Sequence, residues 1–213
     1  MSRLEIRCLK LGLIQTNCYL VSQSDSPFLA VIDPGDYASS IIDSLSLHPT
    51  HIILTHSHFD HVGALWTLHE KFPSAVIAGG AEEDFSPQTI VSVAQSTMGY
   101  YYHGTDLYKC GGKVPAIDLL LKDGDKIGPF TVLNTPGHTK GSICLYSRED
   151  KVLFSGDTLF RHSYGRTDLG GSEAQIMKSL RRLLQLDKDT TVYPGHDEPT
   201  VISDEKVYFG FGS

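Results

Sequence analysis

Four side chains that bind metals well crowd into one short segment of this sequence. His56, His58, Asp60 and His61 form an HxHxDH pattern. Imidazole nitrogen and carboxylate oxygen are ligands that Zn²⁺ and similar divalent ions accept in proteins. In an extended turn the first two histidines point the same way, whereas the aspartate and the last histidine lie past the bend. One ion cannot readily use all four groups, so the pattern predicts two neighbouring metal ions.

Three further candidate ligands occur downstream, each shortly after a β-like run and directly after a glycine. His138 lies in TPGHT, Asp157 in SGDT and His196 in YPGHD. Side chains on turns at the ends of strands can converge on one point while the strands hold them rigidly. Taken singly, each would more often be a capping or core residue. Together with the HxHxDH segment, they extend the candidate ligand set to seven residues.

The elements that must position these residues can be read from hydrophobic periodicity. Short apolar or alternating runs bounded by turn residues predict strands at residues 4–11, 18–21, 28–32, 52–54, 75–77, 130–133, 143–146, 152–154 and 191–193. Apolar residues spaced three and four apart predict amphipathic helices at residues 37–47, 62–71 and 172–186, with Ser172 and Glu173 as a helix start. The HxHxDH segment therefore occupies a strand-to-helix turn.

The order of these elements predicts an α/β fold. Strands grouped in two halves, each with helices, favour a four-layer αββα sandwich of two packed mixed β-sheets flanked by helices. The length suits a single domain over residues 1–213. Residues 82–114 interrupt this succession of strands and helices and are rich in tyrosine. We expect them to form an inserted loop or short helices that could shape a binding site.

Composition narrows the class of partner. The formal net charge is -7, which disfavours binding to nucleic acid or to an anionic membrane. Charged residues interrupt every apolar run near the amino terminus, so neither a signal peptide nor a membrane span is predicted. The four cysteines have no CxxC spacing and are expected to be buried or half-buried free thiols. We therefore expect a cytoplasmic protein that acts on a small molecule, while the oligomeric state is left open.

These motifs resemble the metallo-β-lactamase superfamily over nearly the whole chain, from Asn17-Cys18-Tyr19 through Asp33-Pro34-Gly35 to Pro194-Gly195-His196. The resemblance implies the metallo-β-lactamase fold and a binuclear hydrolase. It assigns His56, His58 and His138 to the first metal ion, and Asp60, His61 and His196 to the second. Asp157 would bridge the two, and Asp33 would support the ligands from behind.

The resemblance also implies a mechanism. A water that bridges two divalent ions loses its proton near neutral pH, and the resulting hydroxide attacks an electrophilic carbonyl or phosphoryl centre. Asp60 and Asp157 are the expected catalytic residues, because Asp60 can orient the nucleophile or relay its proton. Zinc is the default cofactor, with two ions per chain, and the mixed nitrogen and oxygen ligands also accept iron or manganese.

Within the superfamily, Gly156 to Phe160 followed by Gly165-Arg166-Thr167-Asp168 is similar to the glyoxalase II group, the hydroxyacylglutathione hydrolases, and especially to its short single-domain relatives. The expected substrate is therefore a thioester such as a hydroxyacylglutathione. The resemblance implies that Arg166 binds a substrate carboxylate, and an ion pair between Arg166 and Asp168 is the alternative. The helical carboxyl-terminal domain of full-length glyoxalase II has no counterpart here, so fewer groups would hold glutathione.

Two rival functions stay open on the sequence. Persulfide dioxygenases, which have the same fold and one iron ion, also carry a Gly-Arg-Thr-Asp segment like residues 165–168. In that case His56, His138 and Asp157 would bind Fe(II). A lactonase is the second rival, because ring esters suit the same nucleophile.

Overall fold

The computed structural model describes residues 3–45 and 48–210. They divide into two compact units, each with its own sheet. The first contains the described residues up to Gly79 together with Asp84–Leu120, and the second contains Gly80–Glu83 and the described residues from Leu121 onward. Among the described helices, none has the length and apolar character needed to cross a bilayer.

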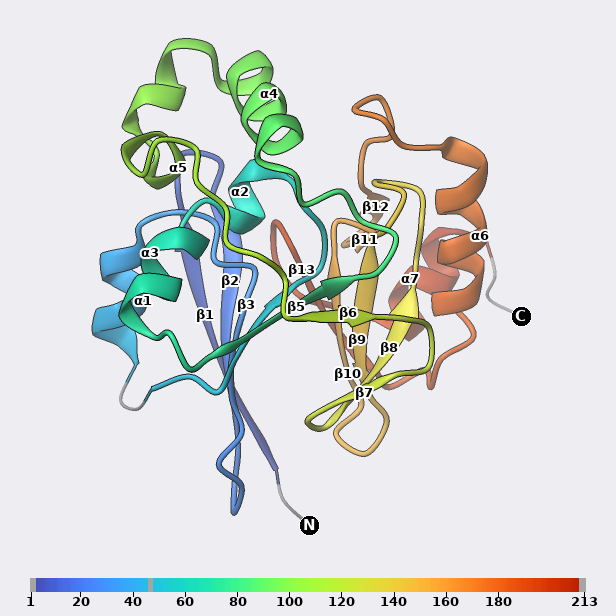
Figure 1. The fold of residues 1–213 in the computed structure, drawn as a ribbon. Helices are drawn as coiled ribbons and strands as arrows, with labels where there is room; N and C mark the ends of the chain where they lie inside the picture. Colours follow the sequence, from blue (N-terminus) through green and yellow to red (C-terminus); the bar gives the residue numbers. More distant parts are fainter. Residues whose placement is uncertain (1–2, 46–47, 211–213) are drawn as a thin grey trace. The chain divides into compact units, whose positions relative to one another are not determined.

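In the first unit, six of the described strands form a sheet in sequence order (Figure 1). They are β1 (Leu4–Leu11), β2 (Thr16–Gln23), β3 (Leu29–Ile32), β4 (His51–Leu54), β5 (Val76–Gly80) and β6 (Leu119–Leu121). β1, β2 and β3 pair antiparallel, whereas β4 runs parallel to both of its neighbours. Parallel central strands are covered on both faces, which explains the unbroken apolar run Ile52, Ile53 and Leu54.

Helices pack on this sheet and lead into its loops. They are α1 (Ala38–Ser44), α2 (Phe59–Val62), α3 (Leu65–Lys71), α4 (Pro87–Met98), the 3₁₀ helix η1 (Gly99–Gly104) and α5 (Asp106–Lys109). Ile41 of α1 and Leu65 and Leu68 of α3 join Ile52 and Leu54 in one buried cluster. The tyrosine-rich segment forms α4, η1 and α5, which agrees with the expectation of short helices.

In the second unit, six of the described strands form a sheet in the order β14-β13-β10-β9-β8-β7. They are β7 (Lys126–Ile127), β8 (Phe130–Asn134), β9 (Ile143–Ser147), β10 (Val152–Gly156), β13 (Thr191–Pro194) and β14 (Thr200–Val201). β10 and β13 are parallel, whereas β7–β8, β8–β9, β9–β10 and β13–β14 pair antiparallel. A short hairpin, β11 (Leu159–Phe160) with β12 (Ser163–Tyr164), follows β10.

Helices α6 (Glu173–Leu183) and α7 (Ile202–Tyr208) cover one face of the second sheet (Figure 1). Leu180 and Leu183 of α6 and Ile202 of α7 pack with Leu153 and Val192 of the strands. Glu173 in the first turn and two arginines in the last turn of α6 complement the helix dipole. This is the clearest helix in the sequence, and the structure confirms it with ends trimmed by one to three residues.

The nine predicted strands are all present, but one helix boundary was wrong. The helix expected from Val62 is interrupted, because α2 ends at Val62 and α3 begins only at Leu65. A Cβ on Gly63 would lie 2.1 Å from the carbonyl oxygen of Gly35. Close backbone packing therefore sets the break. The predicted end of the helix at 37–47 lies partly outside the described residues.

The expected burial of the thiols is correct for three cysteines and wrong for one. Cys18 and Cys144 are buried, Cys110 is half-buried, and Cys8 is exposed on β1. Burial raises the pKa of the Cys18 thiol well above its usual value, so this group packs as an apolar side chain.

Candidate metal centre

The first group of candidate ligands lies in the turn between β4 and α2 and in α2 itself. His56, His58 and His61 are all buried. The rings of His56 and His58 lie 4.8 Å apart and those of His56 and His61 4.1 Å apart, measured between centroids. The Nε2 atom of His61 lies 3.3 Å from Oδ2 of Asp60. The first unit thus brings all four residues of the HxHxDH segment together.

Asp33, at the end of β3, holds this turn from behind. Its carboxylate accepts hydrogen bonds from the backbone N–H of Thr55 at 2.8 Å and from the Thr55 hydroxyl at 2.7 Å. It also lies 3.0 Å from Nδ1 of His61. An ionised carboxylate only accepts hydrogen bonds, so Nδ1 of His61 is the protonated nitrogen and Nε2 is left for a metal ion. This geometry matches the supporting role predicted for Asp33.

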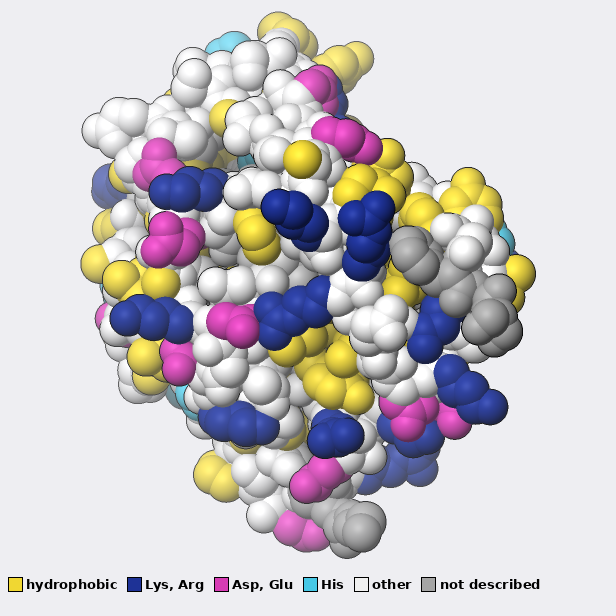
Figure 2. Space-filling model, turned by 90° about the vertical axis from the view of Figure 1, so that its right-hand side faces the viewer, with side chains coloured by type: hydrophobic (Ala, Val, Ile, Leu, Met, Phe, Trp, Pro, Cys, Tyr) yellow, Lys and Arg dark blue, Asp and Glu magenta, His cyan; other side chains and the backbone are white. Residues whose placement is uncertain are grey.

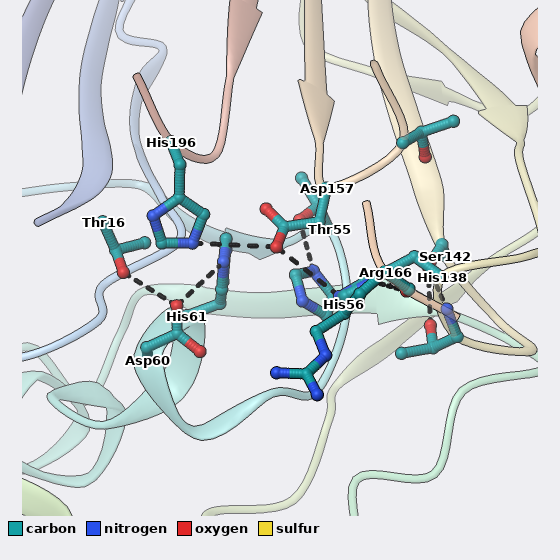
Figure 3. A network of polar contacts seen from close by, with 12 residues as sticks. Thr16, Thr55, His56, Asp60, His61, His138, Ser142, Asp157, Arg166 and His196 are labelled. Carbon is teal, nitrogen blue, oxygen red and sulfur yellow. Dashed lines mark hydrogen bonds and ion pairs between the residues drawn. The ribbon is translucent and has the colours of Figure 1, made fainter. Parts of the chain in front are cut away.

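A second support for this group was not predicted from the sequence. The hydroxyl of Thr16, the first residue of β2, donates a hydrogen bond of 2.8 Å to Oδ2 of Asp60 (Figure 3). The two residues are 44 positions apart in the chain. The only available signal was the TNCY segment at the start of β2, which does not reveal where a threonine hydroxyl points.

The second group consists of His138, Asp157 and His196, which follow β8, β10 and β13. β10 and β13 are parallel neighbours, and the N–H of Gly195 donates to the carbonyl of Gly156 at 2.8 Å. The turns that carry Asp157 and His196 therefore leave the sheet at the same edge. Oδ2 of Asp157 lies 3.5 Å from Nε2 of His138 and 3.7 Å from Nε2 of His196. One carboxylate thus faces two imidazoles.

Backbone atoms orient His138. Its Nδ1 lies 2.7 Å from the carbonyl oxygen of Arg166 (Figure 3), so Nδ1 carries the proton and Nε2 faces Asp157. This close contact requires a glycine at position 165, directly before Arg166. A Cβ on Gly165 would lie 1.9 Å from the carbonyl oxygen of Asp157 and 3.0 Å from Nδ1 of His138. A Cβ on Gly137 would lie 2.3 Å from backbone atoms of Ile176 in α6.

The side chain of Arg166 is engaged by Asp168. Its Nε and one terminal nitrogen lie 2.6 and 2.5 Å from the two carboxylate oxygens. This forked pairing lowers the pKa of Asp168 to about 2 and raises that of Arg166. Both side chains are more than half exposed, so the pair is screened by water. The ion pair between Arg166 and Asp168, which the sequence offered as an alternative to substrate binding, is therefore present. The role of Arg166 in binding substrate stays a prediction.

The donor chemistry of both groups fits a divalent metal ion. Each supplies imidazole nitrogen together with carboxylate oxygen, the combination that zinc and similar ions accept. In both His61 and His138 the remote nitrogen is held by an oxygen acceptor, as in metal-binding histidines generally. A packed core does not require buried imidazoles with a fixed orientation, so this arrangement favours metal binding over simple packing.

The family model of the metallo-β-lactamase superfamily matches residues 11–196. The chain belongs to the metallo-β-lactamase superfamily. This confirms the resemblance and the fold class, an α/β fold of mixed sheets with flanking helices. Metal binding by a His and Asp cluster is characteristic of this fold.

Relatives of this superfamily member match nearly the whole of its sequence. It is 32% identical to hydroxyacylglutathione hydrolase GloC of Haemophilus influenzae, over 95% of each chain. It is also similar to the crystal structure of BLEG-1 B3 metallo-β-lactamase, with 32% identity, a TM-score of 0.81, and coverage of 95% of this chain and 97% of the other. The crystal structure of TTHA1623 in a di-iron-bound form has 34% identity and a TM-score of 0.75, over 93% and 96%.

Proposed function

We propose that this protein is a metal-dependent hydrolase that cleaves a thioester of the hydroxyacylglutathione type. The observation that carries the proposal is Asp157, whose carboxylate faces the Nε2 atoms of both His138 and His196. A carboxylate between two oriented imidazoles suits a residue shared by two metal ions. The similarity to GloC supports the thioester substrate.

In this proposal the seven candidate ligands act together. His56, His58 and His138 would hold one divalent ion, Asp60, His61 and His196 would hold the other, and Asp157 would serve both. Bound there, the ions would supply Lewis acidity to the substrate carbonyl and lower the pKa of water in the site. The oriented tautomers of His61 and His138 support these assignments.

The chain's own residues would guide the proton and the leaving group. Asp60, fixed by Thr16 at 2.8 Å, would accept a proton from the attacking water and pass it to the departing sulfur. Hydrolysis then adds hydroxyl to the acyl carbon, breaks the carbon–sulfur bond and releases a carboxylic acid and a thiol. A thiol has a low pKa among leaving groups, about 8.5, so this step demands little acid assistance.

Arg166 is the proposed contact for a substrate carboxylate. Its guanidinium forms a forked pair with Asp168, and the same two hydrogen bonds support binding of a substrate carboxylate. A substrate carboxylate would compete with Asp168 for the same fork. Changing Arg166 to Ala should therefore raise KM for a carboxylate-bearing thioester while kcat changes little. An unchanged KM with lower stability would restrict Arg166 to its ion pair.

We propose a small molecule as the substrate, and the face shown in Figure 2 agrees with this. On the face shown in Figure 2, Lys and Arg side chains are scattered among acidic and hydrophobic groups. A nucleic-acid site would favour clustered basic residues.

A persulfide dioxygenase is the second candidate. The observation that favours it is the Gly165–Asp168 segment together with the close approach of His138 and Asp157, at 3.5 Å. With His56 these residues would hold a single iron ion. A lactonase would use the proposed hydrolytic chemistry on a ring ester. Zinc is the proposed metal, and the di-iron form of TTHA1623 makes iron the main competitor.

One experiment separates these functions. Zinc, iron and manganese per chain are measured on the purified protein, and hydrolysis of S-D-lactoylglutathione is then followed in the absence of oxygen. We expect two metal ions per chain and rapid loss of the thioester. A single iron ion without hydrolysis would favour the dioxygenase. Two ions without hydrolysis would exclude this substrate and direct the search to other thioesters and to lactones.

A further inference from the structure

Residues Gly80–Glu83 begin at the last residue of β5 in the first sheet but pack within the second unit. They lie against the loop that carries His138. A Cβ on Gly141 would lie 2.1 Å from the backbone nitrogen of Glu83, and one on Gly80 would lie 2.2 Å from the carbonyl oxygen of Gly141. The two glycines therefore allow direct backbone contact between this segment and the His138 loop.

The carboxylate of Glu83 binds that loop twice. Its Oε2 accepts hydrogen bonds from the hydroxyl of Thr139 at 2.7 Å and from the backbone N–H of Gly141 at 2.8 Å. Both bonds end on the same oxygen, and both donors come from residues just after His138. Hydrogen bonds to an ionised acceptor are roughly twice as strong as neutral ones. Glu83 thus holds the loop more firmly than an exposed side chain would.

A chain of hydroxyl groups extends this contact across the loop. Thr139 has one hydroxyl proton, which it donates to Glu83. The 2.6 Å contact between the hydroxyls of Thr139 and Ser142 must therefore use the proton of Ser142. Ser142 in turn accepts from the backbone N–H of Thr139 at 3.1 Å. The carboxylate polarises both hydroxyls in one direction, which strengthens the network.

His138 is consequently held at two points. Arg166 fixes its ring through Nδ1 at 2.7 Å, and Glu83 holds the loop that follows it through the hydroxyl of Thr139 and the backbone N–H of Gly141. We propose that Glu83 is a positioning residue that sets the orientation of His138 for metal binding. The inference rests on the proposed metal site and adds a residue to it that contacts neither metal nor substrate.

Glu82 provides a matched control for Glu83. It is adjacent in the chain and carries the same charge, but its carboxylate pairs at 3.6 Å with Lys140, and both side chains are well exposed. An exposed pair of this kind contributes little stability. Changing Glu82 to Ala therefore removes one negative charge near the His138 loop without removing the bonds to Thr139 and Gly141.

The test measures zinc affinity of the metal-free, full-length protein by competition with a chromophoric chelator, alongside its thermal unfolding. We expect Glu83→Ala to weaken zinc binding by about 10-fold or more, as for other residues that orient ligands. Glu83→Gln keeps an oxygen acceptor and should recover most of the affinity. Thr139→Val should give an intermediate loss, and Glu82→Ala should match the wild type.

Each alternative result has a definite meaning. Unchanged zinc affinity in Glu83→Ala overturns the inference, whatever happens to the stability of the metal-free protein. An equal loss in Glu82→Ala would assign the effect to charge alone and would also overturn it. If Glu83→Ala does not fold, the Thr139→Val variant tests the inference instead. Wild-type zinc affinity in Thr139→Val would contradict a role for this hydrogen-bond network. A wild-type protein that binds no zinc, iron or manganese would instead refute the proposed function, and this inference with it.

Discussion

The two groups of candidate ligands are built in opposite ways. In the first unit, His56, His58, Asp60 and His61 lie in one segment and are oriented by the side chains of other residues, chiefly Asp33. In the second unit, the ligands lie on three separate loops between residues 138 and 196, and the ring of His138 is oriented by the backbone carbonyl of Arg166. The first group therefore depends on the buried carboxylate of Asp33, whereas His138 in the second group depends also on close approaches that glycine allows.

Among the predicted variants, the largest loss of activity is expected for a change of Asp157, which faces two other candidate ligands. Asp157→Ala removes the carboxylate that lies beside both His138 and His196. We expect metal content to fall and thioester hydrolysis to drop by roughly 1,000-fold or more, since the residue is proposed to serve both ions. Metal analysis and kcat/KM test this. Full metal content and full activity would contradict the shared role.

A change to Gly165 should disrupt the second group through its backbone. Gly165→Ala places a Cβ about 2 Å from the carbonyl of Asp157, and we expect a loss of about 3 kcal/mol in the free energy of unfolding, as for overpacked sites. Urea unfolding of the metal-free protein measures it. Gly104→Ala is the control, because a Cβ there meets no atom of the described structure within 4 Å. Equal stability of the two variants would argue against the close approach.

The first group should respond to a change of charge at constant size. Asp33→Asn retains the shape but places an amide group against Thr55 and Nδ1 of His61, all of which need an acceptor. We expect metal affinity to fall by about 10- to 100-fold. Asp43→Asn, at an exposed position of α1, serves as the control. Competition with a chelator measures the metal affinity of both variants. Wild-type metal affinity in Asp33→Asn would show that Asp33 does not support the ligands.

The smallest effect is expected at the exposed pair of Arg166 and Asp168. Because the pKa of folded Asp168 is lowered from 3.8 to about 2, the pair stabilises the folded protein above about pH 4. That contribution is lost as the pH falls toward 2. NMR titration of the Asp168 carboxyl between pH 5 and 3 should show it still charged, whereas Arg166→Ala should allow protonation near the ordinary pKa. Identical titrations would contradict the pairing.

Most of the strands and the ligand types were predictable because their signals are local. Alternating or unbroken apolar runs identified nine strands, and the HxHxDH spacing predicted the first group of candidate ligands. The short strands β7, β11, β12 and β14 were missed because two residues carry too little periodicity. The break between α2 and α3 was also missed, since it results from packing of Gly63 on Gly35, which lies far away in the sequence.

The sequence by itself determined which residues can bind metal, because donor chemistry belongs to the residue type and the strand pattern to its neighbours. Only the tertiary structure decided how those residues are oriented. Thr16 on Asp60, the Arg166 carbonyl on His138 and Glu83 on Thr139 are contacts between distant parts of the chain. Hydrogen bonds require both distance and direction, and neither is set until the backbone has folded.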